Sequence, residues 1–163
     1  MEQKLKKAKN LIKRKNYSEA FGLLRSAEKE GDPIASYALG TWYLHGTHVK
    51  KDLQKGVQYL IRASKGNLKE AFYDLAVCYE KGAGTEKNLQ KAFQNYLIAS
   101  RLGDKDALYQ VVRCLYYGIG VPKNKELSLL IYTKFFDSDK NSKMSKPING
   151  NEKIKKVNKL AFA

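Results

Sequence analysis

The chain has 163 residues and a hydrophobic share of 43%, which fits one soluble domain with room for a core. No stretch of 18 apolar residues exists and the N-terminal apolar residues are scattered among lysines, so we expect no membrane span, no secretory signal and a cytoplasmic location. The net charge of +15 is concentrated at the ends, since residues 1–15 hold seven basic residues against one acidic and residues 137–163 hold seven against three. Such a surface favours acidic proteins, nucleic acids or anionic membranes without choosing among them.

A pattern of small, aromatic and glycine residues returns every 36 positions. The same residue type recurs at positions 36 apart, and we call such a set of positions a column. Three columns are identical in three successive copies: Ala35, Ala71 and Ala107; Tyr37, Tyr73 and Tyr109; Gly46, Gly82 and Gly118. A fixed period of this size marks a chain of stacked copies of one small unit. Because one unit cannot bury its apolar face alone, neighbouring units must cover each other in an elongated body.

Within each unit, a helix is predicted after an Asn or Asp column that can accept a hydrogen bond from an unpaired N–H of the first turn, at Asn16, Asp52, Asn88 and Asn124. Apolar residues then follow with helical spacing. We expect these helices to end near Gly31, Gly66 and Gly103, each in the left-handed conformation. Asp32, Asn67 and Asp104 come directly after these glycines and are expected to cap the next helix.

That next helix carries a second apolar stripe, as at Ala35, Leu39 and Trp42, and is expected to stop at Gly46, Gly82 or Gly118. Small residues share two columns where helices must cross closely: Ala20, Gly56, Ala92 and Ser128, and Gly40 with Ala76. Cys78 and Cys114 lie in the column of Trp42. Helices pack about 8–10 Å apart, which is too far for a disulfide, so both are predicted to be free, packed thiols.

The last part of the chain, residues 137–163, changes character. It reads as a basic polar loop followed by a short amphipathic helix with Ile154, Val157, Leu160 and Ala161 on one side. We expect this helix to cap the open end of the stack. A separate binding helix is the alternative.

The repeated unit resembles the Sel1-like repeat, a relative of the tetratricopeptide repeat. The resemblance is carried by ASYALGTWYLHG (35–46), AFYDLAVCYEKG (71–82) and ALYQVVRCLYYG (107–118), and it covers roughly residues 1–136. It implies an all-α fold, an α/α superhelix (solenoid) of helix pairs, with units of about 1–31, 32–66, 67–103 and 104–136.

Residues with catalytic or metal-binding chemistry are scarce. His45 and His48 are the only histidines, and Asp52, their one acidic neighbour, is explained as a helix cap, whereas a zinc site needs three or four ligands. No serine has a G-x-S-x-G setting, and the Gly82-Ala83-Gly84 turn lacks the strand and third glycine of a dinucleotide site. We therefore expect no enzyme activity, no metal and no cofactor.

The resemblance to tetratricopeptide proteins implies that the first helix of each unit lines a concave, partner-binding face. The residues this places on the face are Ile34, Tyr37, Thr41, Leu44 and His45; Glu70, Tyr73, Val77, Glu80 and Lys81; and Asp106, Tyr109, Arg113, Tyr116 and Tyr117. Tyr and Arg dominate binding hot spots, but the tyrosine column also has a structural interpretation as a ladder of rings between units. Arg113, Tyr116 and Tyr117 depart from the repeat pattern and are the better candidates for specific recognition.

Two functions remain open. The first is a protein-interaction module, an adaptor or an immunity-type protein, monomeric when free, that binds a protein or peptide, for which an acidic partner is one option. Resemblance to bacterial family members implies a toxin, effector or regulatory protein as that partner. The second is a nucleic-acid binder that uses the terminal lysines, among them Lys4, Lys6, Lys153 and Lys155, although charge runs are usually solvated surfaces.

Overall fold

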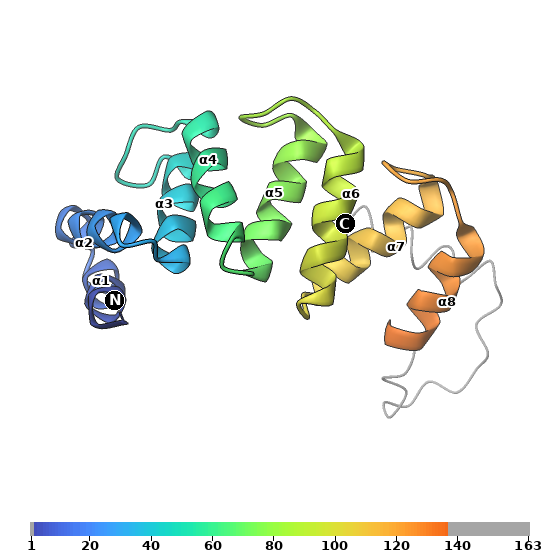
Figure 1. Ribbon diagram of the computed structural model, residues 1–163, viewed down its shortest axis with the longest axis horizontal. Coiled ribbons are helices and arrows are strands. Elements are labelled where there is room, and N and C mark those ends of the chain that lie inside the picture. Colours follow the sequence, from blue (N-terminus) through green and yellow to red (C-terminus); the bar gives the residue numbers. More distant parts are fainter. Residues whose placement is uncertain (1, 137–163) are drawn as a thin grey trace.

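The computed structural model describes residues 2–136, which form eight α-helices and no strand (Figure 1). The predicted all-α fold is confirmed, and the expected C-terminal capping helix lies outside the described residues. The helices in chain order are α1 (Glu2–Lys13), α2 (Tyr17–Lys29), α3 (Pro33–His45), α4 (Leu53–Ser64), α5 (Lys69–Lys81), α6 (Leu89–Arg101), α7 (Lys105–Tyr117) and α8 (Lys125–Phe136).

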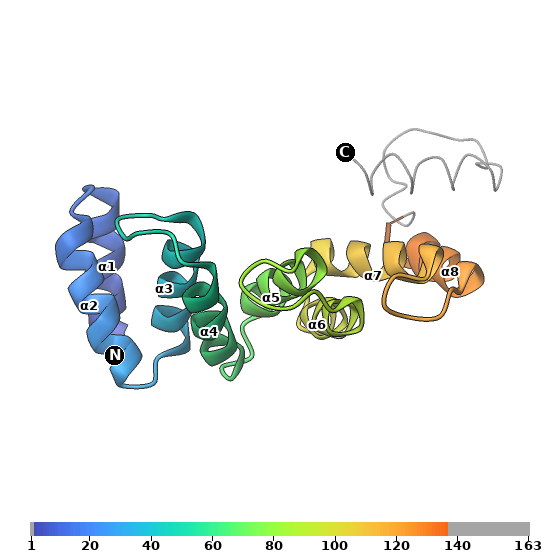
Figure 2. The same cartoon turned by 90° about the horizontal axis from the view of Figure 1, so that it is seen from above.

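The helices form an extended row in which chain order is also spatial order (Figure 1). The main contacts all join consecutive helices, from α1 with α2 to α7 with α8. Figure 2 shows the twist along this row, because α5 and α6 are seen end-on while α2 and α4 lie across the view. The arrangement is that of a helical-repeat solenoid, in which each pair is covered by its neighbours.

The Asn and Asp column caps the second helix of each pair, as predicted. Asn16, Asp52, Asn88 and Asn124 each accept a hydrogen bond at Oδ1 from the backbone N–H three residues on, at 2.8–3.4 Å. The first helices α3, α5 and α7 end at Gly46, Gly82 and Gly118, whose φ values of 69–77° are left-handed. These shared caps explain why the helices restart at the same spacing.

The junction between α4 and α5 corrects one prediction. Asn67, with φ 54°, adopts the left-handed conformation that was expected of Gly66, and it does not cap α5. The cap position is Leu68, which has no side-chain acceptor, so α5 begins without a side-chain cap. Position 66 requires glycine because of packing and not because of its backbone conformation: a Cβ there would lie 2.4 Å from the Cβ of Pro33, too close for any side chain. The period of 36 itself aligns Asn67 with Gly31 and Gly103, and Leu68 with Asp32 and Asp104.

Small residues set the spacing between paired helices. A Cβ on Gly56 would lie 2.7 Å from Cγ of Leu44 and 3.2 Å from the backbone oxygen of Gly40, so α3 and α4 cross with almost no space between them. Trp42, Cys78 and Cys114 are all buried in the same column, and both thiols are free, as predicted. Among the described residues, no helix is long and apolar enough to cross a bilayer.

Candidate partner-binding site

The predicted binding residues of the second repeat line one hollow, which we call the central hollow. It has a volume of about 560 Å³ and lies where α5, α7 and the start of α6 meet. Its lining comprises four predicted residues, Tyr73, Val77, Glu80 and Lys81, and four others, Lys87, Leu89, Tyr96 and Gln110. Half of the lining of this hollow thus consists of predicted residues, and the other half does not.

A charged network lies beside the central hollow and includes Glu80 of its lining. Glu80 on α5 accepts a hydrogen bond from the Tyr96 hydroxyl at 2.8 Å and another from Nη2 of Arg113 at 2.6 Å. Nε of Arg113 donates to Gln110 at 2.7 Å. The Glu80 and Arg113 side chains are only 24% and 11% exposed, so the pair is partly desolvated and stronger than a surface ion pair.

The tyrosine column ties each first helix to the next one. The Tyr37 hydroxyl donates to Asp74 at 3.1 Å, and the side-chain hydrogen-bond partner of Tyr73 is Gln110, which is one period after Asp74. Burial raises the pKa of Asp74, and burial with the Asp74 charge beside it raises the pKa of Tyr37. These contacts favour the structural-ladder interpretation for Tyr37, whereas Tyr73 contributes both to the ladder and to the hollow.

Tyr109 is the last member of this column. Its ring packs edge-on against Tyr132 and Phe136, at centroid distances of 6.5 and 5.3 Å. Its hydroxyl is buried without a hydrogen-bond partner, and burial raises its pKa to about 12. Tyr109 thus belongs to the interface of α7 with α8 and does not line the central hollow.

Two lysines form the rim of the hollow. Lys81 lies in the last turn of α5, and Lys87 in the turn that leads to α6; both are exposed. Lys87 lies close to the end of α5, since a Cβ built on Gly82 would be 3.2 Å from the Cβ of Lys87. The N–H of the next residue, Asn88, donates to the Tyr79 carbonyl at 2.8 Å and fixes the turn. The backbone of this turn therefore fixes where the Lys87 side chain begins.

The remaining predicted residues do not join the central hollow. Thr41 and His45 lie on α3, where the Thr41 hydroxyl donates to the Ala38 carbonyl and His45 is exposed. Tyr116 corrects the prediction, because it is buried at 6% exposure with Nζ of Lys125 5.2 Å from its ring centre. Leu44 and Glu80 occupy the same repeat position as Tyr116. Side chains at this position contact the second helix of their own pair. Tyr117 is half-buried, with its ring 4.8 Å from that of Tyr116.

The residues missed by sequence reasoning carried partial signals. Lys87 shares its place in the repeat with Lys51 and Lys123, and Tyr96 is on the buried side of its helix. Asp74 and Gln110 occupy one column, 37 residues after a tyrosine each, so a search for polar residues at that offset would have found both. Leu89, 37% exposed just after the Asn88 cap, carried no signal.

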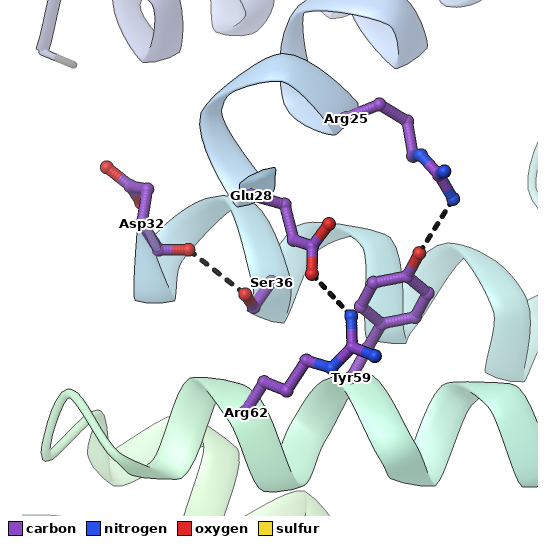
Figure 3. Close-up of polar contacts among 6 residues, drawn as sticks. All are labelled: Arg25, Glu28, Asp32, Ser36, Tyr59 and Arg62. Atoms are coloured by element: carbon purple, nitrogen blue, oxygen red, sulfur yellow. Dashed lines mark hydrogen bonds and ion pairs between the residues drawn. The ribbon is translucent and has the colours of Figure 1, made fainter. Parts of the chain in front are cut away.

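A second set of polar contacts joins α2 to α4, next to a bond from the Ser36 hydroxyl to the Asp32 carbonyl at the start of α3 (Figure 3). Arg25 donates to the Tyr59 hydroxyl at 2.9 Å, and Arg62 pairs with Glu28 at 2.5 Å. A smaller hollow of about 300 Å³ lies beside this pair. Since each charged group here except the exposed Lys65 already has a partner, these contacts serve mainly to join the first two helix pairs.

His48 and the two cysteines have structural roles. The His48 ring lies 6.0 Å from that of Trp42 and 5.9 Å from that of Phe21, in an aromatic cluster. Burial raises the pKa of Cys78 and of Cys114 to about 11, which keeps both thiols protonated and unreactive. In the part of the chain that the structure describes, no three His, Cys, Asp or Glu side chains are grouped to hold a metal.

The lysines of α1 are partly engaged within the fold. Lys4 pairs with Glu30 and Lys7 with Glu19, both on or just after α2. Lys153 and Lys155 lie outside the described residues. Two of the five lysines of α1 are thus balanced by acidic residues of the same helix pair.

Comparison with known families and structures agrees with this architecture. The family model of the Sel1 repeat matches residues 10–32, 33–68, 69–104 and 105–138. The chain therefore belongs to the Sel1 repeat family, whose members are generally protein–protein interaction modules and typically non-catalytic scaffolds. No match was found among curated proteins.

Three solved structures are similar to this chain. A Sel1 repeat protein from Oxalobacter formigenes is 27% identical with a TM-score of 0.74, over 80% of this chain and 54% of that one. The protective antigen c5321 of uropathogenic Escherichia coli, with an SLR fold, is 25% identical with a TM-score of 0.70, over 75% and 26%. Helicobacter pylori cysteine rich protein B is 32% identical with a TM-score of 0.53, over 55% and 68%. The chain thus spans about half of the first protein and a quarter of the second.

Proposed function

We propose that this protein is an interaction module whose protein or peptide partner docks along α5 and α7 and enters the central hollow. The observation that carries the proposal is the hollow itself, where tyrosine, an aliphatic floor and charged groups from three helices converge on about 560 Å³. Surfaces that combine aromatic anchors with a few polar groups are those that bind partners. We further propose that it acts as a cytoplasmic, monomeric adaptor or immunity-type protein.

Three features support a binding role for this surface rather than a purely structural one. Val77 and Leu89 leave apolar surface open in the hollow, although buried alanines and leucines already fill the core nearby. The Glu80–Arg113 pair holds α5 and α7 rigidly together beside the hollow, so little conformational entropy of the protein is lost when a partner binds. Lys81 and Lys87 remain at the rim with exposed side chains.

A substitution that fills the hollow tests the proposal. The partner is first identified by chemical crosslinking of the wild-type protein in cells that make it, and its affinity is then measured by calorimetry. Val77→Arg places a long side chain in the hollow and is expected to weaken binding at least about tenfold, the scale of losing one hot-spot contact.

Gln94→Arg is the matched control, because Gln94 is exposed on α6 and does not line the hollow. It adds the same charge and should leave the affinity within about twofold. Circular dichroism establishes that both variants are folded. Equal affinity of Val77→Arg and wild type would place the partner elsewhere.

A further inference from the structure

We infer that the central hollow selects an acidic partner segment: a peptide that inserts an apolar side chain between Tyr73, Val77 and Leu89 and places carboxylates against Lys81 and Lys87. This inference rests on the proposed function and adds the chemistry of the partner. It is carried by the balance of charge in and around the hollow.

The first step is that Glu80, the one acidic group lining the hollow among the described residues, is already neutralised. Each carboxylate oxygen of Glu80 accepts one short hydrogen bond, from Tyr96 at 2.8 Å and from Arg113 at 2.6 Å. Glu80 and Arg113 together contribute no net charge. A carboxylate that enters the hollow therefore meets the neutral Glu80–Arg113 pair and not an unpaired Glu80 carboxylate.

The second step is that the rim cations are uncompensated. Within residues 2–136, neither Lys81 nor Lys87 forms an ion pair, and both side chains are exposed. Glu86 is in the same turn as Lys87, but it does not line the hollow. The hollow and its rim thus carry a net positive charge from two lysines whose backbones are fixed by α5 and by the turn.

The third step is that the other acidic residues of this face lie toward Tyr73 and away from the rim lysines, since the charge of Asp106 acts on Tyr73. Glu70 and Asp106 lie in the first turns of α5 and α7, whereas Lys81 is in the last turn of α5. Eleven residues separate Glu70 from Lys81, which at 1.5 Å per residue is about 16 Å along the helix, beyond the screening length in physiological salt. An acidic segment beside the rim lysines is therefore attracted by them and is little repelled by Glu70, whereas Asp106 disfavours acidic groups at the Tyr73 end of the hollow.

The apolar floor favours a peptide over a nucleic acid. Tyr73, Val77 and Leu89 offer a surface for one aliphatic or aromatic side chain, while a nucleic-acid site requires many cations along a groove. Two cations beside an apolar floor match one anchor residue flanked by Asp or Glu.

Selection from a random library of phage-displayed 12-residue peptides on the full chain tests the inference. We expect enrichment of peptides that hold one large apolar residue next to Asp or Glu. One selected peptide, made with a fluorescent label, is then titrated against wild type and against Lys81→Glu/Lys87→Glu. The double variant is expected to weaken binding at least about tenfold, because it replaces two attractive rim charges by repulsive ones.

Two further variants separate local recognition from overall charge. Lys9→Glu/Lys29→Glu alters exposed lysines of α1 and α2 and lowers the net charge by the same amount, so binding within about twofold of wild type is expected. Lys81→Arg/Lys87→Arg keeps the rim positive and should bind within about threefold of wild type.

The inference is overturned if the selection yields no binding peptide or yields neutral or basic ones, or if both charge-reversal variants weaken binding equally. The natural partner distinguishes this failure from that of the proposed function. If Val77→Arg abolishes partner binding and Lys81→Glu/Lys87→Glu does not, the hollow is the docking site but its occupant is not acidic. If Val77→Arg has no effect, the proposed function itself fails.

Discussion

At the residue scale, two glycines are required by close approach between helix pairs. Gly84 and Gly120 are left-handed, with φ of 74° and 68°, and a Cβ on either would lie 2.2 or 1.9 Å from the carbonyl oxygen of Leu53 or Leu89. His48, in the same column of the first turn, has φ 60° and packs its ring into an aromatic cluster. The left-handed backbone alone thus does not require glycine at this position. The close contact with the second helix of the preceding pair does require it, α4 for Gly84 and α6 for Gly120.

Gly120→Ala is therefore expected to be strongly destabilising. The new methyl group collides with backbone at Leu89, which cannot move without shifting α6, so we expect a loss of about 3 kcal/mol or more in the free energy of unfolding. Urea denaturation followed by circular dichroism measures it. Gly22→Ala is the control, because Gly22 lies within α2 with open space around its Cα and should gain about 0.5–1 kcal/mol. Similar effects of both substitutions would contradict the close-approach argument.

The buried thiols allow a second prediction at this scale. Burial raises the pKa of Cys78 and Cys114 to about 11, so at pH 8 about one thiol in a thousand is ionised. The native protein should react with a thiol reagent only on the timescale of unfolding, and both cysteines should react at once in guanidinium. The thiolate fraction rises as the pH approaches 11. Rapid labelling of the native protein at pH 8 would show that the column is open to solvent.

At the element scale, the start of α5 lacks a cap that its neighbours possess. Leu68 has φ, ψ of −76°, 115°, close to Asp32 at −70°, 119° and Asp104 at −82°, 112°. The backbone is thus already suited to a capping side chain, and Leu68→Asp is expected to raise the free energy of unfolding by about 1 kcal/mol.

Asp104→Leu is the reverse change in the same column. It removes the bond from the Ala107 N–H, at 2.8 Å, and should cost about 1 kcal/mol. Thermal unfolding of both variants measures the two effects. A loss of stability in Leu68→Asp would mean that the half-buried Leu68 side chain contributes more by packing than a cap would.

The elements were predictable to the extent that they depend on local chemistry. The Asn16 column and the end glycines act through hydrogen bonds within a few residues, so the sequence alone located both ends of α4 and α6 closely. Asn67 was misread because a glycine next to it suggested the ordinary terminator. The Glu80–Tyr96–Arg113 network was not predictable, since it depends on how three long side chains from three helices meet across the stack.

At the scale of the whole molecule, the core consists of clusters along the row that are linked by partly buried residues such as Tyr79. The buried residues form separate clusters along the row, such as one around Trp42 and Tyr43 and another around Tyr96 and Val111. Because the main contacts join consecutive helices, stability is expected to behave as a sum of local units and their interfaces. A perturbation at one end should therefore be felt there first.

Hydrogen exchange of two matched variants tests this locality. Arg113→Ala removes the tie between α5 and α7, which is charged and partly buried, and should cost about 2 kcal/mol. Amides of α7 and α8 are then expected to exchange about thirtyfold faster, while those of α1 and α2 keep the wild-type rate. Arg25→Ala removes the contact with Tyr59 at the other end and should give the opposite distribution, through a smaller effect. If either variant accelerates exchange equally in all helices, the row unfolds as one cooperative body, and the division of the core into clusters has no energetic meaning.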